Sequence, residues 1–250
     1  MTETLALLGR VGAFGGRIVV AAARGRVPLG DIAAHLHVVV LRCLGPVLAV
    51  VFPFGMVMAL QGLQIFRMYG AERLLSPFVA AAIIRELSPV MASVLVAAQG
   101  GSSFAAELGA MRIKEELDAT DVMAVDSVAF HAAPRAIALT VACPLLNVFG
   151  CVSGILGGYV CAVWIEGEPS GIWWSALWDM TTPLDVVASV VKTTVFGAII
   201  GLLSCYLGFH AKGGAAGVGR AVNDTVVWSV LAFIAANYLL TSAFFGGGTP

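Results

Sequence analysis

Three ionisable side chains stand inside stretches of sequence that are otherwise apolar. Arg85 and Glu86 interrupt the apolar run 74–106, and Lys192 interrupts the run 184–209. At a rise of 1.5 Å per helical residue, Arg85 and Glu86 lie roughly 15 Å from the start of their run, and Lys192 lies roughly 12 Å from the start of its own. If these runs cross a bilayer, each charge costs on the order of 3 kcal/mol unless it is paired or hydrated.

Because of that cost, we expect Glu86 to pair with Lys192 or with Arg85, which leaves net positive charge at this depth. Two interpretations of these charges stay open. They line a pathway for an acidic amphiphile, or they form an ion pair that only locks two helices together. A nucleophilic serine needs a Lys or His partner, and Lys192 is the one such residue within an apolar run. No spacing pairs it with Ser153, so the sequence does not favour a covalent mechanism.

A second group of charged residues lies between two apolar runs, in the segment 111–125. Ile113, Leu117, Thr120 and Ala124 recur at helical spacing and share one face, while the other faces carry four carboxylates. The pattern predicts a short amphipathic helix over 113–125, too small to be stable alone. Such a helix suits a groove on a partner protein, and a solvated loop helix is the alternative.

The composition indicates a lipid environment. The chain has 250 residues, of which 59% are hydrophobic and 12% are charged, and its mean hydropathy is +0.94. A soluble domain carries about 25% charged residues, so this chain has too little polar surface to cover a globule. The net charge of -1 and the lack of a Lys/Arg-rich run give no support to nucleic-acid binding.

Motifs for nucleotide, metal or redox chemistry are missing from the sequence. A phosphate-binding P-loop needs Gly before Lys, whereas the three lysines follow Ile113, Val191 and Ala211. The histidines are not spaced as metal ligands, and the cysteines form no C-x-x-C pair, so we interpret the cysteines as small buried side chains. We therefore predict a chain that is not an enzyme and binds no metal or cofactor itself.

Five apolar runs each meet or exceed the roughly 20 residues needed to cross hydrocarbon. They predict a single-domain, all-α membrane protein over residues 1–250, with membrane helices at about 43–64, 74–106, 134–164, 184–209 and 226–245.

The segment 3–26 is amphipathic rather than apolar. Glu3, Arg10, Arg17 and Arg24 fall seven residues apart and therefore share one face. A basic stripe beside apolar residues such as Leu5 predicts an interfacial helix in the headgroup layer. A surface helix against a partner subunit is the alternative.

The distribution of Lys and Arg predicts the orientation of the chain in the membrane. With five spans, one side receives Arg10, Arg17, Arg24, Arg26, Arg42, Arg112, Lys114, Arg135, Lys212 and Arg220, and the other receives Arg67 and Arg73. We therefore expect a cytoplasmic N-terminus and an extracytoplasmic C-terminus. Two further expectations follow from this orientation. Trp164, Trp173, Trp174 and Trp178 form an aromatic belt at the outer interface, and the Gly-rich stretch 212–220 is a flexible cytoplasmic turn.

Several motifs, in order and over most of the chain, resemble those of the MlaE/YrbE permease family. They are Gly70-Ala-Glu72, Arg85-Glu-Leu-Ser-Pro-Val90, Ala105-Ala-Glu-Leu-Gly-Ala-Met111, Glu115-Glu-Leu-Asp-Ala119, Val122-Met-Ala-Val-Asp126, Pro134-Arg135 and Lys212-Gly-Gly-Ala-Ala-Gly-Val-Gly-Arg-Ala-Val-Asn223. One departure concerns the stretch Ala97-Ala-Gln-Gly-Gly-Ser102, where the family often reads Ala-Gly-Arg-Val-Gly-Ser. Any role of that arginine does not carry over to Gln99.

The resemblance implies the permease subunit of an ABC transporter that moves lipid. ATP–Mg would then be bound by a separate ATPase, and MCE-domain proteins and a second YrbE-type permease, identical or different, would be partners. The implied location is the inner (plasma) membrane of a bacterium. The Gly/Ala-rich composition and the stretch 212–223 are similar to those of actinobacterial YrbE proteins of Mce systems, which implies import of a fatty acid, mycolic acid, sterol or phospholipid.

The same resemblance assigns candidate residues. The acidic helix would be the coupling helix that docks in the ATPase, through Glu115, Glu116, Leu117, Asp118, Asp121 and Met123. From the residue types themselves, not from the resemblance, we predict a lipid pathway that includes Arg85, Glu86 and Lys192, with apolar walls from first-span residues such as Phe54 and Met58. The alternatives are an ion-coupled transporter or channel without an ATPase, which uses the three charges as a relay, and a membrane scaffold that transports nothing.

Overall fold

The computed structural model describes residues 2–25 and 27–246, with side chains from residue 9 onward. The predicted side-chain positions of Glu3 and Leu5, and the position of Arg26, therefore lie outside the described residues. Within the described part of the chain all regular structure is helical. This confirms the prediction of an all-α protein.

Five helical segments are long and apolar enough to cross a membrane. The first is α2 (Leu29–Met68), the fourth α9 (Pro183–Phe209) and the fifth α10 (Gly214–Phe245). The second, Glu72–Ile113, is built from η1 (Glu72–Leu74), α3 (Leu75–Ala82), η2 (Ile83–Leu87), α4 (Ser88–Val96), η3 (Ala97–Gly101) and α5 (Ser102–Ile113). The third, Val128–Ile165, comprises η4 (Val128–Ala132), α7 (Ala133–Tyr159) and η5 (Val160–Ile165).

These helices extend beyond the apolar runs that predicted them. The first begins at Leu29 rather than at residue 43, so His35 and His37 lie inside a helix and not ahead of it. His35 packs edge-on against Phe104, with 5.2 Å between ring centroids. The difference arises because polar residues at a membrane boundary continue a helix without contributing to its hydropathy.

The tightest helix contact lies between α2 and α7. A Cβ atom placed on Gly55 would lie 2.0 Å from the carbonyl oxygen of Gly154, so the two backbones touch at this point. Small residues permit such close approach, and van der Waals contact between helices replaces the hydrophobic effect inside lipid. The small residues of α7 therefore let α2 and α7 pack backbone to backbone.

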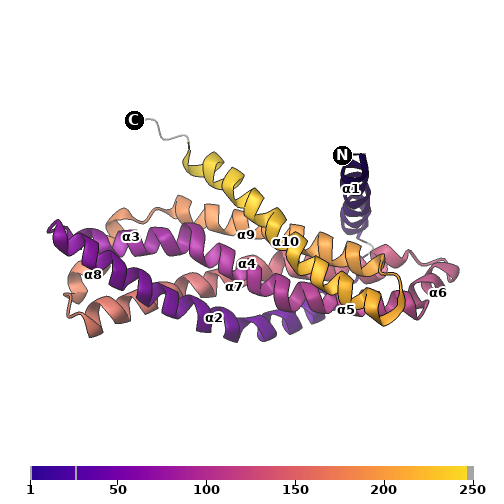
Figure 1. Ribbon diagram of the computed structural model, residues 1–250, viewed down its shortest axis with the longest axis horizontal. Coiled ribbons are helices and arrows are strands. Elements are labelled where there is room, and N and C mark those ends of the chain that lie inside the picture. Colours follow the sequence, from indigo (N-terminus) through magenta and orange to yellow (C-terminus); the bar gives the residue numbers. More distant parts are fainter. Residues whose placement is uncertain (1, 26, 247–250) are drawn as a thin grey trace.

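The bundle has two ends that carry different short elements. Figure 1 shows α6 (Glu116–Val122) at one end of the long axis and α8 (Ser170–Met180) at the other. At the α8 end, Arg67 forms ion pairs with Glu166 at 2.9 Å and Glu168 at 3.1 Å. The helix α8 was not predicted, and it changes the expected aromatic belt. Trp173 is only 3% exposed, because α8 packs on α3 and Trp173 inserts beside Gly158, whereas Trp164 and Trp178 are exposed.

The helix α1 (Thr2–Ala23) lies near the α6 end and runs across the long axis of the bundle rather than along it (Figure 1). Its buried residues include Phe14, Ile18 and Ala21. Phe14 packs against Tyr206 and against Phe209, with 5.7 Å between ring centroids in both cases. One face of α1 is therefore fixed to α9, and the helix is not held by the headgroup layer alone.

The Gly-rich stretch 212–220 was expected to be a flexible turn, and this is wrong for most of its length. The turn ends at Gly213, which has φ 91°, and α10 begins at Gly214. Gly213 adopts a left-handed conformation that other residues rarely take. The glycines that follow form the first turns of α10, since tertiary contacts outweigh their weak helix propensity.

Candidate functional site

The predicted intramembrane charges meet in one cluster, formed by η2, α9 and α10. Lys192 is fully buried, and its Nζ donates hydrogen bonds to Glu86 Oε1 at 2.9 Å and to the Arg85 carbonyl at 2.8 Å. Of the two partners proposed for Glu86, the structure therefore selects Lys192. Glu86 lies about 20 Å along its span from Glu72 at 1.5 Å per residue, well inside the apolar part of the bundle.

Arg85 has a different partner, which sequence reasoning missed. Its Nε lies 2.9 Å from Oδ1 of Asp185, a carboxylate whose side chain is 4% exposed. The expected excess of positive charge is therefore wrong, because two cations face two carboxylates. The signal was available, since Asp185 lies seven residues before Lys192 and shares its helix face. Asp185 also closes the capping box of α9, in which its Oδ2 accepts the backbone N–H and hydroxyl of Thr182.

The last span contributes further polar contacts to Glu86. On α10, Asn237 donates to Oε2 of Glu86 at 2.8 Å, and Thr241 donates to Oε1 at 2.9 Å. Arg85 stacks over the ring of Phe245 at 4.3 Å. Asn237 and Thr241 are spaced i, i+4 in an apolar run, and this pattern could have placed them on the same face as a buried partner.

A π-helical segment supports this geometry. Arg85 and Glu86 lie in η2, where the wider turn interrupts the regular α-helix. Segments of this type occur often at functional sites. Two adjacent side chains here reach α9 residues seven positions apart, Asp185 and Lys192, which are about 10 Å apart along the helix axis.

A ladder of uncharged polar side chains continues inward from the cluster. Ser88 donates to the Asn147 carbonyl at 2.9 Å, and the Asn147 amide donates to Ser189 at 2.7 Å. All three residues are at most 2% exposed. Because an unsatisfied polar group is costly in an apolar interior, this ladder fixes the register of α4, α7 and α9 relative to one another.

The predicted apolar wall does not adjoin these charges. Phe54 is 44% exposed and Met58 is partly exposed, and both lie on α2, which packs on α7 and α3. Figure 1 shows α2 along the opposite edge of the bundle from α10. A different apolar pocket of about 240 Å³ lies beside the cluster, between α7, α8 and α9. Its lining includes Ile84, Val152, Leu177, Trp178, Val186 and Val190.

The segment predicted as a coupling helix is shorter than the expected 113–125. The helix α6 spans Glu116–Val122, because Glu115 and Ala124 adopt left-handed backbone conformations with φ 61° and 62°. Glu115 ends the helical path between α5 and α6, and Ala124 ends it between α6 and the third span. Side-chain pattern alone gave no sign of either break.

Two buried residues attach α6 to the bundle. Leu117 is completely buried, and Thr120 lies 3.2 Å from Nε2 of His131 in η4. His131 in turn accepts, through its carbonyl, a hydrogen bond from Arg135 at 2.7 Å, and Arg135 pairs with Glu107 of α5 at 3.4 Å. The helix α6 is thus connected to both the second and the third span.

The outward face of α6 is both acidic and apolar. Val122 is 87% exposed and Met123 is 69% exposed. The exposed carboxylates next to them are Glu115, Glu116, Asp118 and Asp121. Of the six candidate coupling residues, Leu117 alone faces the bundle, and the other five lie on the surface at this end.

The structure offers no metal centre in its described ranges. Within residues 2–25 and 27–246, no three His, Cys, Asp or Glu side chains gather closely enough to hold a metal ion. Four cysteine side chains are buried, in agreement with their apolar interpretation: Cys43, Cys143, Cys161 and Cys205.

Comparison with known proteins agrees with this arrangement. The sequence profile of a family described as Permease MlaE matches residues 32–243. A probable ABC transporter permease protein of Rickettsia bellii is 38% identical over 201 residues, which cover 80% of this chain and 78% of the relative. The intermembrane phospholipid transport system permease protein MlaE of Haemophilus influenzae is 31% identical over 244 residues, covering 96% and 93%. The chloroplastic protein TRIGALACTOSYLDIACYLGLYCEROL 1 of Arabidopsis thaliana is 32% identical over 232 residues, covering 93% and 66%. The chain, a multi-pass membrane protein, therefore belongs to the MlaE permease family.

Proposed function

We propose that this chain is the permease subunit of an ABC-type lipid transporter. ATP hydrolysis occurs in a separate ATPase, which grips the outward face of α6. The observation that carries the proposal is the construction of α6, which exposes Val122 and Met123 among carboxylates and is tied to two spans through Leu117 and Thr120. A helix of seven residues has little stability of its own, so a force on its outer face passes to the spans that hold it.

We propose a route by which a force on α6 reaches the charged cluster. The contact of Thr120 with His131 leads into the third span, and Arg135 leads from there to Glu107 of the second. Farther along the second span, η2 carries Arg85 and Glu86 to their partners on α9. Closure of the ATPase is proposed to shift these spans relative to α9 and α10. The apolar pocket beside the cluster would then change shape.

The substrate is proposed to be an amphiphile with an acidic head. The walls of the pocket at α7, α8 and α9 suit an acyl chain, and the neighbouring Arg85 and Lys192 suit an acidic group once their carboxylates move away. In finer detail we propose a phospholipid, fatty acid or mycolic acid imported by an Mce system; a sterol, which the family resemblance also implies, has no acidic head for Arg85 and Lys192 to bind. A second YrbE-type permease and MCE-domain proteins complete this complex, and the N-terminus faces the cytoplasm. The resemblance of the stretch 212–223 supports this assignment.

Charge reversal on α6 tests the coupling role. The double variant Glu115→Lys/Glu116→Lys, purified with its ATPase and reconstituted in proteoliposomes, is expected to lose ATP-dependent extraction of a fluorescent phospholipid by about ten-fold or more. The reason is that a groove that binds an acidic helix repels two lysines in its place, and like charges brought together at an interface cost several kcal/mol of binding free energy. The control is Asp31→Lys, which reverses an exposed carboxylate on α2. Unchanged coupling in the double variant, or equal loss in the control, would count against docking at α6.

Gentle purification tests the alternatives. Mass spectrometry of the intact complex is expected to find a nucleotide-binding subunit and bound lipid. A chain that purifies without any such subunit, and that still moves ions, would favour the charge relay. A complex that moves no lipid through this chain, and that assembles normally after neutralisation of Arg85 and Lys192, would favour a scaffold.

A further inference from the structure

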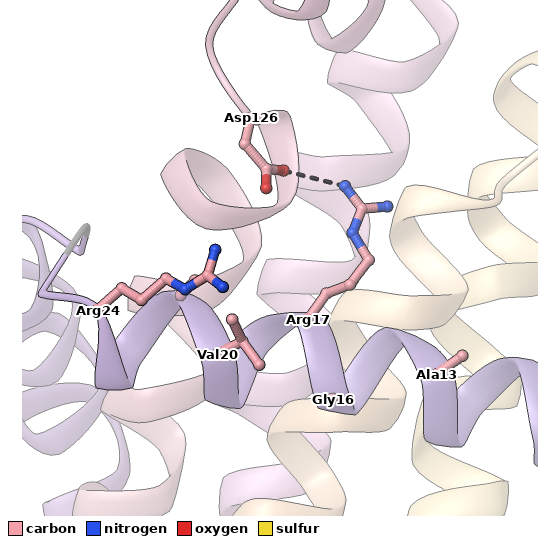
Figure 2. Close-up of a pocket in the computed structure, with 7 residues that line it drawn as sticks. Ala13, Gly16, Arg17, Val20, Arg24 and Asp126 are labelled. Atoms are coloured by element: carbon pink, nitrogen blue, oxygen red, sulfur yellow. Dashed lines mark hydrogen bonds and ion pairs between the residues drawn. The ribbon is translucent and has the colours of Figure 1, made fainter.

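A groove of about 390 Å³ separates α1 from the loop that follows α6. Figure 2 shows Arg17 and Arg24 reaching from the same side of α1 toward this loop, which carries Asp126. Ala13, Gly16 and Val20 of α1 also line the groove, and Val20 lies between the two arginines along the helix. We refer to this feature as the α1 groove.

The α1 groove carries more positive than negative charge. Arg17 Nη2 pairs with Oδ1 of Asp126 at 3.0 Å, and this is the carboxylate that lines the groove. Among the residues that the structure describes, Arg24 has no ion-pair partner. The groove therefore holds two guanidinium groups and one carboxylate, and within the described part of the chain the Arg24 guanidinium is available to bind an anion.

The setting of the groove is amphipathic. On α1, Phe14 and Ile18 are buried against the bundle, whereas Val19 is 66% exposed and Val20 is 46% exposed. The helix runs across the bundle at the α6 end (Figure 1). A helix in this position, with exposed valines beside arginines, matches the boundary between acyl chains and headgroups.

We propose that the α1 groove binds the headgroup of an anionic phospholipid of the surrounding membrane. Arg17 and Arg24 hold the phosphate, because guanidinium groups donate paired hydrogen bonds to phosphate oxygens, and Val20 contacts the glycerol and upper acyl region. This site is separate from the transport pathway, since it lies at the α6 end and outside the helical bundle. It does not depend on the proposed function.

The bound lipid competes with Asp126 for Arg17. Asp126 also accepts the backbone N–H groups of Val128 at 3.1 Å and Ala129 at 3.4 Å, and so caps the start of the third span. The loop that carries it follows α6 directly. The anionic lipid content of the membrane therefore sets how firmly α1 is fastened to the loop after α6.

Lipid retention by the full-length protein tests this proposal. The protein is incorporated into nanodiscs of equal parts phosphatidylglycerol and phosphatidylcholine, then released and examined by native mass spectrometry. The wild-type protein is expected to retain phosphatidylglycerol in preference to phosphatidylcholine. Arg17→Gln and Arg24→Gln each reduce that enrichment by about ten-fold, since a hydrogen bond to a charged group contributes that order of affinity. Arg10→Gln is the matched control, because it removes the same charge from the same stripe outside the groove.

A second variant tests the competition. Asp126→Asn keeps an oxygen for the N–H groups of the third span but removes the charge, and it is expected to increase phosphatidylglycerol retention. Equal losses in Arg10→Gln and Arg24→Gln would overturn the proposal, because a diffuse basic stripe would explain them. Absence of enrichment in wild type, or displacement of the lipid by inorganic phosphate at millimolar concentration, would overturn it as well.

Discussion

The variant Glu86→Gln is expected to destabilise the protein more than Lys192→Met, although both break the same ion pair. The asymmetry comes from burial, because the Lys192 side chain is 0% exposed and that of Glu86 is 40% exposed. Glu86→Gln leaves a buried ammonium without a countercharge. Lys192→Met leaves a carboxylate that keeps two hydrogen-bond donors, Asn237 and Thr241.

The magnitudes follow from these contacts. Removing one partner of a buried pair costs about 3–5 kcal/mol, and the lower part of this range applies to Glu86→Gln because the amide oxygen still accepts one hydrogen bond. For Lys192→Met we expect about 1–2 kcal/mol, the cost of losing one charged hydrogen bond while Asn237 and Thr241 of α10 still donate to the carboxylate. In the double variant Glu86→Gln/Lys192→Met no unpaired charge remains. Its loss is expected to be smaller than that of Glu86→Gln alone.

The free energy of unfolding can be measured in mixed micelles by titration with sodium dodecyl sulfate, with far-ultraviolet circular dichroism as the signal. A double-mutant cycle then gives the coupling energy, which is expected to exceed about 1 kcal/mol. Two results would refute the reasoning: a larger loss in Lys192→Met than in Glu86→Gln, or additive losses in the double variant.

The same double variant separates the two interpretations of the pair. If Glu86→Gln/Lys192→Met regains stability and also transports lipid normally in proteoliposomes, the pair only locks α9 to the second span. If stability returns but transport is lost, the charges act in the pathway itself.

Two further predictions concern packing. Gly55→Ala is expected to destabilise the protein by about 1–3 kcal/mol or more, because its Cβ would overlap the Gly154 carbonyl. The control Gly45→Ala lies on the same helix, meets nothing within 4 Å, and is expected to be neutral or mildly stabilising. The same unfolding titration checks both variants, and equal stability changes would contradict the α2–α7 contact. Leu117→Ala is expected to cost about 2–5 kcal/mol locally and to loosen α6, measured as faster backbone hydrogen exchange in that helix, while Val122→Ala at an 87% exposed position leaves exchange unchanged. Similar exchange in both variants would show that α6 is not held through its buried face.

The number of spans and the need of Glu86 for a cationic partner, Lys192 or Arg85, could be predicted because both rest on large energies. Hydrocarbon selects apolar runs about 20 residues long, and a charge within such a run needs a partner. Helix ends were less predictable. Polar residues at the boundary extend a helix at little cost, so the first span begins at Leu29 rather than at residue 43.

Other features were not predicted, either because a signal was overlooked or because the residue types carry none. Asp185 was missed as the partner of Arg85 because it lies at the edge of its run, where a carboxylate costs little and so looks unremarkable. Nothing in the residue types distinguishes Trp173, which is buried by α8, from the exposed Trp164. The left-handed residues Glu115 and Ala124 likewise have side chains that give no hint of their backbone conformation.

The helix α10 makes its polar contacts with η2 at a single carboxylate, and this has a mechanical consequence. Only 11% of the residues in its most apolar part are buried, compared with 50% in each of the second and third spans. Its side-chain hydrogen bonds to η2 all end on Glu86, and its remaining contacts are packing contacts such as that of Phe233 with Phe196 of α9, whereas α2 and α7 touch backbone to backbone at Gly55 and Gly154. A displacement that separates Glu86 from Asn237 and Thr241 would let this part of α10 move relative to η2, while α2 and α7 keep their positions.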